Sequence, residues 1–268
     1  MHFSFFYMIF DVFSYLVCHN LLFSDRAKLV ENAIEKLNQT GVVITSITCD
    51  NTQVNITMLN NLGARISANN MKVTLDKKNS ENKPIFVIMD VAHLIKLIRN
   101  TLGDMKTLIS PDGQVVSWKY VKELNNLQST EGLHMANKLR KSHVEYTKHK
   151  MKVNLAAQTI SDSVATSIDF CRDHLKLTQF QNSESTTTFF RIFDKIFDVM
   201  NSRSPIGRFS KSPMKITNSN DWLKTFDDTM SYILRLKHDG GPLVIEGSVT
   251  HKALTFNHLI MGQSTVLH

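Results

Sequence analysis

The stretch Val42 to Asp50, VVITSITCD, decides the fold class of the amino-terminal half. Its β-branched, mostly apolar residues are typical of a strand that is buried on both faces of a sheet. A second such run, Ile85 to Met89 (IFVIM), is followed by Asp90. Both predicted strands therefore end at an aspartate, at the edge where open α/β sheets gather their ligand sites.

Helical and strand patterns alternate around these two runs. We predict a strand over Phe13 to His19, a helix from an N-cap at Ser24 through Leu37, a short helix through Met58 that stops at Gly63, a loop over Asp76 to Lys83, and a helix over His93 to Leu102 with Gly103 beyond it. Such alternation favours an α/β sheet with parallel neighbours.

The pattern changes from about Tyr120, where amphipathic stretches replace strand signals. Helices are predicted over Val121 to Leu127, Gly132 to Lys148, Val153 to Leu175, Thr186 to Asn201 and Asp221 to Leu236. A boundary near Leu127 to Glu131 then separates an α/β domain, residues 1–127, from an all-α domain, residues 128–268.

Composition narrows the class of protein. The net charge of +7 favours a polyanionic partner. The three cysteines are far apart and form no CxxC pair, so the sequence encodes no zinc finger. Free cysteines of this kind suit a reducing compartment. The apolar stretch Met1 to Phe23 lacks the basic start of a signal peptide, and Asp11 interrupts it, so no membrane association is expected. Residues Met1 to Phe10 are interpreted as a non-native start.

Asp50 and Asp90 each allow two interpretations. Asp50, followed by Asn51, either holds a divalent cation or caps the helix that begins near Gln53. Asp90 and His93 form a D-x-x-H pair that suits a metal or phosphate role, or a helix cap beside a hydrogen-bonded histidine.

The stretch Lys138 to Lys152, KLRKSHVEYTKHKMK, holds six Lys/Arg and two His against one Glu. Such a helix either binds phosphates by charge or is a solvated face. The sequence contains no GxxxxGK[ST], so a P-loop nucleotide site is excluded, and GxGxxG, GxSxG and HExxH are absent too.

Four long segments, in order along the chain, resemble the P-element transposase family, which includes the THAP-domain transposase-derived proteins of animals. They are SITCDNTQVNITMLNNLGA (46–64), DVAHLIKLIRNTLGD (90–104), EGLHMANKLRKSHVEYTKHKMKVNLAAQTISDSVA (131–165) and FRIFDKIFDVMNSRSP (190–205). The resemblance implies a partial RNase H-like α/β core followed by a helical GTP-binding insertion domain, which is incomplete at its C-terminal end.

The family's core uses an acidic triad with Mg²⁺ to cleave and transfer DNA strands, and it acts in the nucleus. By this resemblance Asp50 is the catalytic, metal-binding carboxylate, with Asn51 where the family usually has Gly, and Asp90 and His93 support the active centre. The first Asp and the final Glu of the triad have no match in this chain. We therefore expect it to be inactive in cleavage alone, because one carboxylate cannot hold two metals.

The insertion of the family binds GTP without a P-loop. By segment match Lys138 approaches the phosphates, Val153 and Ser161 line the pocket, and Asp198 and Asn201 meet the guanine edge. A structural alternative pairs Asp198 with Arg203. The family's zinc finger is absent, so DNA contact, including contact with transposon ends, would be to the backbone and salt-dependent, from Lys96, Arg99, Arg140 and Lys141.

Three interpretations of function remain open. The chain is part of a DNA transposase with Mg²⁺ and GTP as cofactors and DNA as partner, which acts as a homo-oligomer. Alternatively, it is a domesticated, non-catalytic protein that binds GTP and DNA. A third interpretation is a decayed gene product with no stable activity.

Overall fold

The computed structural model describes residues 23–66, 72–132, 135, 137–202, 206–207, 209–241 and 243–244. The strand predicted over Phe13 to His19 and the interpretation of Met1 to Phe10 lie outside these residues. Contacts divide the chain into two compact units, Met1–Ile88 and Met89–His268. We call them the first and second unit and describe each by itself.

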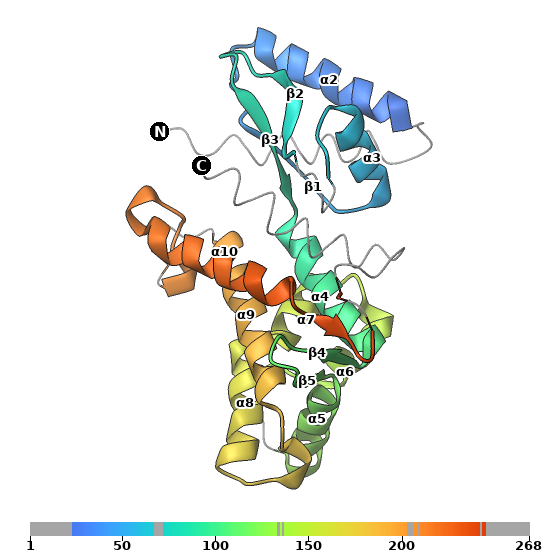
Figure 1. Ribbon diagram of the computed structural model, residues 1–268, viewed down its shortest axis with the longest axis vertical. Helices are drawn as coiled ribbons and strands as arrows, with labels where there is room; N and C mark the ends of the chain where they lie inside the picture. The colour runs from blue at the N-terminus through green and yellow to red at the C-terminus, as the bar shows by residue number, and fades with distance from the viewer. Residues whose placement is uncertain are drawn as a thin grey trace. The chain divides into compact units, whose positions relative to one another are not determined.

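The described part of the first unit is a three-stranded sheet with helices α2 and α3 (Figure 1). Its elements are α2 (Phe23–Gln39), β1 (Ser46–Cys49), α3 (Gln53–Asn61), β2 (Thr74–Lys78) and β3 (Pro84–Met89). The strands follow the order β1-β3-β2, and α2 packs against α3. The predicted strand 85–89 and the first two predicted helices are therefore present, with α2 beginning one residue before Ser24. The strand predicted over 42–49 is present only from Ser46 to Cys49.

The loop predicted over Asp76 to Lys83 is wrong in its first part, because Thr74–Lys78 is strand β2. Leu75 is buried, whereas Asp76 and Lys78 are exposed and Lys77 is half-buried, so this strand shows only one buried apolar residue among charged ones. β2 also pairs antiparallel with β3, where the sequence predicted parallel neighbours. The buried Asn79 closes this hairpin: its Oδ1 accepts from the backbone N–H groups of Glu81 and Lys83, at 3.0 and 2.9 Å.

The second unit is mostly helical. Its longer helices are α4 (Val91–Met105), α5 (Lys119–Glu131), α7 (Val153–Thr159), α8 (Asp162–Asp173), α9 (Glu184–Met200) and α10 (Ser219–Ile233). Its short elements are α6 (Lys141–Val144) and the 3₁₀ turns η1 (Tyr146–His149), η2 (Thr178–Phe180), η3 (Phe209–Lys211) and η4 (Ile216–Asn218). The change of character that the sequence places near Leu127 to Glu131 falls inside this unit, at the end of α5.

A small antiparallel sheet of order β5-β4-β6 belongs to the same unit. Its strands are β4 (Thr107–Ile109), β5 (Val115–Ser117) and β6 (Lys237–His238). Ile109 pairs with both Val115 and Lys237, so the sheet joins residues far apart in sequence.

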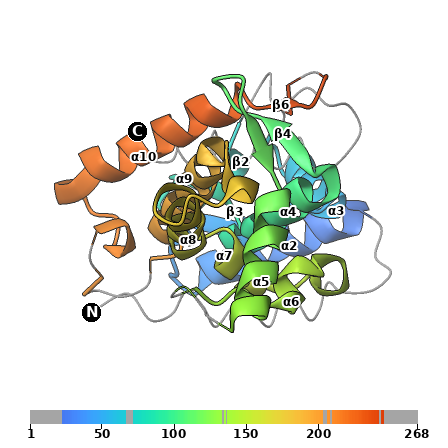
Figure 2. The same ribbon diagram turned by 90° about the horizontal axis from the view of Figure 1, so that it is seen from below.

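Helix α9 is at the centre of the second unit, because it contacts α8, α10, α4 and β5. Figure 2 shows α8 and α9 side by side. Phe189, Phe190 and Phe193 recur at helical spacing along α9 and are fully buried. Their burial supplies the apolar area that holds the surrounding helices together.

Two predicted helices are broken in the structure. The described residues between 132 and 149 form the short α6 and the turn η1 rather than one long helix, and Gly132 is left-handed with φ 67°. Residues 153–175 contain a break at Ile160, whose ψ of 76° is not helical, before the Ser161 side chain caps α8. The helical spacing of apolar residues continues across both breaks, so the sequence pattern did not predict them.

The helix predicted to stop before Gly103 continues to Met105. A Cβ atom built on Gly103 would lie 2.5 Å from Cζ of Tyr146, so the glycine serves close packing of the Tyr146 ring against α4 rather than helix termination. Among the described residues, no helix combines the length and apolar character needed to cross a bilayer.

Candidate functional site

Asp50 follows β1 directly and lies half-buried at the entrance to α3. Its Oδ1 accepts hydrogen bonds from the backbone N–H of Thr52 at 3.3 Å, from Thr52 Oγ1 at 2.9 Å and from Asn55 Nδ2 at 2.5 Å. Thr52, not Asp50, occupies the N-cap position of α3. The carboxylate thus fixes the turn between strand and helix through one oxygen.

Asp90 follows β3 and is the N-cap of α4. Its Oδ1 accepts from the N–H of Ala92 at 2.9 Å and its Oδ2 from the N–H of His93 at 3.2 Å. The helix-cap interpretation of Asp90 is therefore confirmed, and the His93 side chain is half-buried. β1 and β3 are neighbours in the sheet; a ligand site at the aspartates that follow them stays a prediction.

The fit of these residues to a two-metal centre is incomplete. Such a centre needs several carboxylate oxygens around ions about 3.5–4 Å apart. Within the described part of the chain, no three His, Cys, Asp or Glu side chains gather closely enough to hold an ion. Asp50 can supply one ligand, and no cleavage step follows from the described residues alone.

The predicted nucleotide residues Ser161, Asp198 and Asn201 lie on or between α8 and α9, which pack against each other. Ser161 is the N-cap of α8: its Oγ accepts from the N–H of Val164 at 3.4 Å and donates to the carbonyl of Gln158 at 3.0 Å. The next N–H, that of Asp162, donates to Oδ2 of Asp194 on α9 at 3.1 Å. This bond ties the start of α8 to the middle of α9.

Asp198 lies one turn beyond Asp194, and Asn201 is the C-cap of α9. Burial raises the pKa of the Asp198 carboxyl, against the opposing charge of Lys211, whose Nζ is 3.6 Å from Oδ2. Ser210 donates a 3.4 Å hydrogen bond to the same oxygen. The partners of Asp198 are therefore residues of η3. The alternative partner Arg203 lies outside the described residues.

Lys138 and Val153 have a weaker structural link to α8 than Ser161 does. Lys138 is exposed and follows Asn137, whose Nδ2 donates to Ser167 Oγ on α8 at 2.8 Å. Val153 is half-buried at the first position of α7. Within the described ranges, no hydrogen bond or ion pair joins either residue to Asp198. A single pocket holding all five predicted residues stays a prediction.

Two of the residues predicted to contact DNA are inside the protein. Arg99 is fully buried, and its Nη2 donates to the carbonyls of His149 and Lys150 at 3.0 and 3.2 Å. Burial lowers the pKa of its guanidinium to about 10. Lys96 is 9% exposed. We therefore withdraw both from the DNA-contacting set, because helix α4 turns this face toward the core.

Arg140 and Lys141 remain exposed, as the sequence predicted. Lys141 lies 3.6 Å from Glu145, which also pairs with Lys148 at 2.9 Å. One carboxylate thus offsets two of the cations in this stretch. Exposed ion pairs of this kind are weak, so both lysines stay available to a polyanion.

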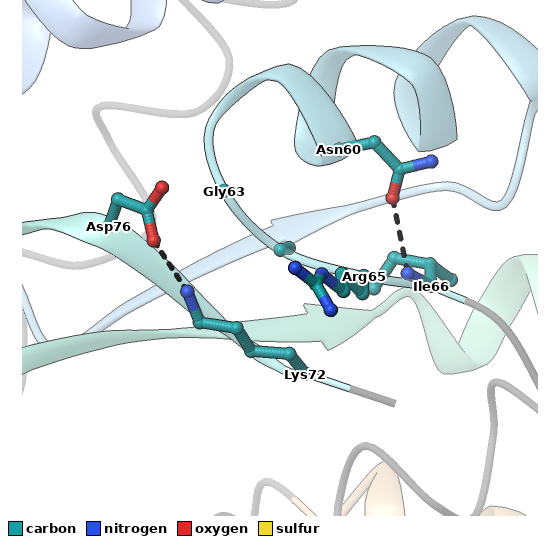
Figure 3. A pocket seen from close by; sticks show the side chains of 7 residues that line it. Asn60, Gly63, Arg65, Ile66, Lys72 and Asp76 are labelled. Atoms are coloured by element: carbon teal, nitrogen blue, oxygen red, sulfur yellow. Dashed lines mark hydrogen bonds and ion pairs between the residues drawn. The ribbon is translucent and has the colours of Figure 1, made fainter. Parts of the chain in front are cut away.

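The pocket shown in Figure 3 lies elsewhere, in the first unit. Its volume is about 560 Å³, and its lining residues are Asn60, Gly63, Ala64, Arg65, Ile66, Lys72 and Asp76. The Lys72–Asp76 ion pair, 2.5 Å, lies at its wall. None of the predicted site residues lines it.

Comparison with known families matches both halves of the chain. Residues 12–63 match a family model described as the TNP-like RNase H N-terminal domain. Residues 92–213 match the TNP-like GTP-binding insertion domain. The chain belongs to the P-element transposase-like family.

Two curated relatives lie in this family. Human DNA transposase THAP9 is 31% identical over 189 residues, which are 70% of this chain and 21% of that protein. The Transposable element P transposase of Drosophila melanogaster is 29% identical over 175 residues, 65% of this chain and 22% of that protein. The matches thus span about a fifth of the length of these relatives.

A solved structure, the Drosophila P element transposase strand transfer complex, shares the fold. Its TM-score is 0.72 at 22% identity, over 89% of this chain and 51% of that chain. The predicted fold class, RNase H-like α/β followed by a helical insertion, is therefore confirmed for this member of the P-element transposase-like family.

Sequence reasoning missed Asp194 in the insertion of this P-element-type chain. Burial raises the pKa of its carboxyl to about 6, the N–H of Asp162 opposes that rise, and the charge of Asp198 adds to it. The spacing Asp194 to Asp198, four residues within the helical stretch FRIFDKIFD, would have placed both on one face of α9. Because the residues around them are apolar, this stretch was interpreted as part of the core instead.

Proposed function

We propose that this chain provides part of a DNA transposase: a portion of the RNase H-like core and a GTP-binding insertion domain. The observation that carries the proposal is the match of one family model to residues 12–63 and of the second to residues 92–213, in that order. The reaction class is Mg²⁺-dependent attack of water or a DNA 3′-OH on a phosphodiester, in the nucleus. Transposon DNA is the partner, and the acting form is a homo-oligomer.

Asp50 is the residue we assign to the metal in this proposal. Its Oδ1 is held by Thr52 and Asn55, which would orient the carboxylate for a cation. Asp90 caps α4, and we assign it and His93 a supporting role in this proposed active centre. One carboxylate does not complete the centre, so the proposal expects no strand cleavage by this chain alone.

Guanine recognition is assigned to Asp198, with Asn201 beside it. A carboxylate accepts the paired N1–H and N2–H₂ donors of guanine, and a partly buried site strengthens such bonds. Lys138 would reach the phosphates, and Val153 and Ser161 would line the pocket. The basis is the half-buried position of Asp198 on α9 beside the start of α8.

A thermal-shift assay tests the nucleotide assignment on the full chain. GTP, but not ATP, is expected to raise the melting temperature, because ligand bound only to the folded state stabilises it. Asp198→Ala should abolish the shift, while Asp50→Ala and the exposed Asp227→Ala should keep it. Absence of a shift at millimolar GTP, or equal loss in Asp198→Ala and Asp50→Ala, contradicts the assignment.

A second candidate is a domesticated, non-catalytic protein that binds GTP and DNA. The observation in its favour is that the described residues gather no metal-binding group of three side chains. Flanking genomic sequence separates the two. Coding sequence for an acidic strand upstream and an acidic helix downstream supports the transposase, whereas stop codons there support the binding protein.

A further inference from the structure

Asp194 is a half-buried carboxylate between two residues of the proposed nucleotide site. It lies on α9 one turn before Asp198, and its Oδ2 accepts the N–H of Asp162, 3.1 Å away, next to Ser161 at the start of α8. The proposed contacts with GTP give this side chain no role. Its position nevertheless links the two helices that carry them.

The charges around Asp194 leave it without an ion pair among the described residues. Asp162 on α8 and Asp198 on α9 are acidic, and Lys211 of η3 pairs with Asp198 instead. Arg191 is one turn away, but it binds Asp162 at 2.9 Å and Asp169 at 2.7 Å. Asp194 therefore accepts one backbone N–H, and two neighbouring carboxylates repel its charge, which the more weakly acting charge of Lys211 only partly offsets.

This environment disfavours the ionised form of the side chain. Burial is the largest cause, and it raises the pKa of Asp194 to about 6. The carboxyl can then gain or lose its proton near neutral pH with a small change of local charge. A nucleotide bound beside Ser161 and Asp198 would be such a change, because its net negative charge repels a carboxylate more strongly where water is partly excluded.

We propose that Asp194 is a positioning residue of the nucleotide site: it holds the first turn of α8, and with it Ser161, against the face of α9 that carries Asp198, and its protonation tunes nucleotide affinity. The inference rests on the proposed GTP site. Bound nucleotide favours the protonated carboxyl, so GTP binds more tightly below pH 6 than above it. The protonated carboxyl keeps its carbonyl oxygen as acceptor for the N–H of Asp162.

Calorimetric titration of the full chain with GTP between pH 5.5 and 8 tests the inference. The terminal phosphate of the nucleotide titrates in the same range, so the informative quantity is the affinity ratio of Asp194→Asn to wild type at each pH. Asparagine keeps an acceptor for the N–H of Asp162 but carries no charge. The ratio is expected to be near one at pH 5.5 and to rise several-fold by pH 8.

Three further samples make the outcome decisive. Asp194→Ser, which also removes the titrating group, should follow Asp194→Asn, and the exposed Asp227→Asn should follow wild type at every pH. A ratio for Asp194→Asn that does not change with pH overturns the inference even if GTP binds. If wild type binds no GTP at any pH, the proposed function fails first.

Discussion

Arg99 holds the chain at residues 149 and 150 from the inside of the second unit. Its guanidinium donates to both carbonyls and lies 5.6 Å from the ring centre of Tyr146, while its Nε and Nη1 have no hydrogen-bond partner among the described atoms. The positively charged stretch from Lys138 to Lys152 therefore depends on a buried cation for its placement.

Arg99→Ala is expected to lower the free energy of unfolding by about 2–4 kcal/mol, because packing and two hydrogen bonds to carbonyls are lost. Arg140→Ala, at an exposed position, should change it by less than about 0.5 kcal/mol. Urea denaturation of both variants measures the difference. Equal stability of the two would show that Arg99 is not an anchor.

Asp194 also makes stability depend on pH. Its pKa in the folded protein is about 6, above the usual value near 3.9, so the fold favours the protonated form. The stabilisation is fully present below the unfolded pKa and is lost as pH rises through about 6. Asp194→Asn should therefore melt above wild type at pH 8 and level with it at pH 4; a constant difference across this range contradicts the sign.

Gly103→Ala tests the contact between α4 and the Tyr146 ring. Overpacking typically costs about 1–3 kcal/mol, more than alanine gains by its helix propensity. A lower melting temperature is expected, although alanine normally stabilises a helix interior. If the variant melted higher, the Tyr146 ring would not lie against Gly103.

The sequence predicted the roles of some single residues and not of others. The Asp90 cap was readable, because a carboxylate before a helix satisfies its first N–H groups. Arg99 was misread as a surface cation, since charge alone does not say which face of α4 is buried. Asp194 was missed, because its role depends on a contact with α8 that is not local in sequence.

The β2–β3 hairpin is the element of the first unit with the clearest single determinant. The Asn79 side chain accepts from two backbone N–H groups and donates to the carbonyl of Ile44 at 3.0 Å. Asn79→Ala should lower the free energy of unfolding by about 2–3 kcal/mol, by leaving buried groups unpaired.

Asn79→Asp separates the two roles of this side chain. It keeps the acceptor but turns a carboxylate oxygen toward the carbonyl of Ile44, so its loss of stability should exceed that of Asn79→Ala at neutral pH and shrink as the carboxyl is protonated in acid. Chemical denaturation provides both values. A loss for the aspartate that does not change with pH would show that this side chain does not face the carbonyl of Ile44.

Whole elements were predictable where the apolar pattern was long and local, as in α4 and α9. The breaks at Gly132 and Ile160 were not, because the helical period continues through them. The lysines of β2 obscure its strand pattern, and β4, β5 and β6 are too short to give one. Ile109 finds its partner Lys237 more than a hundred residues away, and no local pattern encodes such a pairing.

At the scale of the molecule, the fold class and the family followed from long matching segments, whereas the predicted domain boundary near Leu127 to Glu131 stays a prediction. The α4 helix and the β4–β5 hairpin belong by their contacts to the second unit, although their sequence reads as part of an alternating α/β pattern. Compact units are set by which apolar faces meet, and the sequence alone does not show that.

DNA binding is expected to be weak, non-specific and steeply dependent on salt, with Arg140 and Lys141 as the remaining predicted contacts. Each phosphate contact contributes about one unit to the slope of log affinity against log salt. The variant Arg140→Ala/Lys141→Ala should reduce that slope by about two. An unchanged slope, measured by fluorescence anisotropy on duplex DNA, would place the binding surface elsewhere.

A structure of the chain determined with GTP bound tests the central claim most directly. We predict that the guanine edge meets Asp198 on α9, with Ser161 at the pocket wall and the phosphates toward Lys138. Nucleotide found in another place, such as the pocket lined by Asn60 and Asp76, with Asp198 still paired to Lys211, would contradict the account.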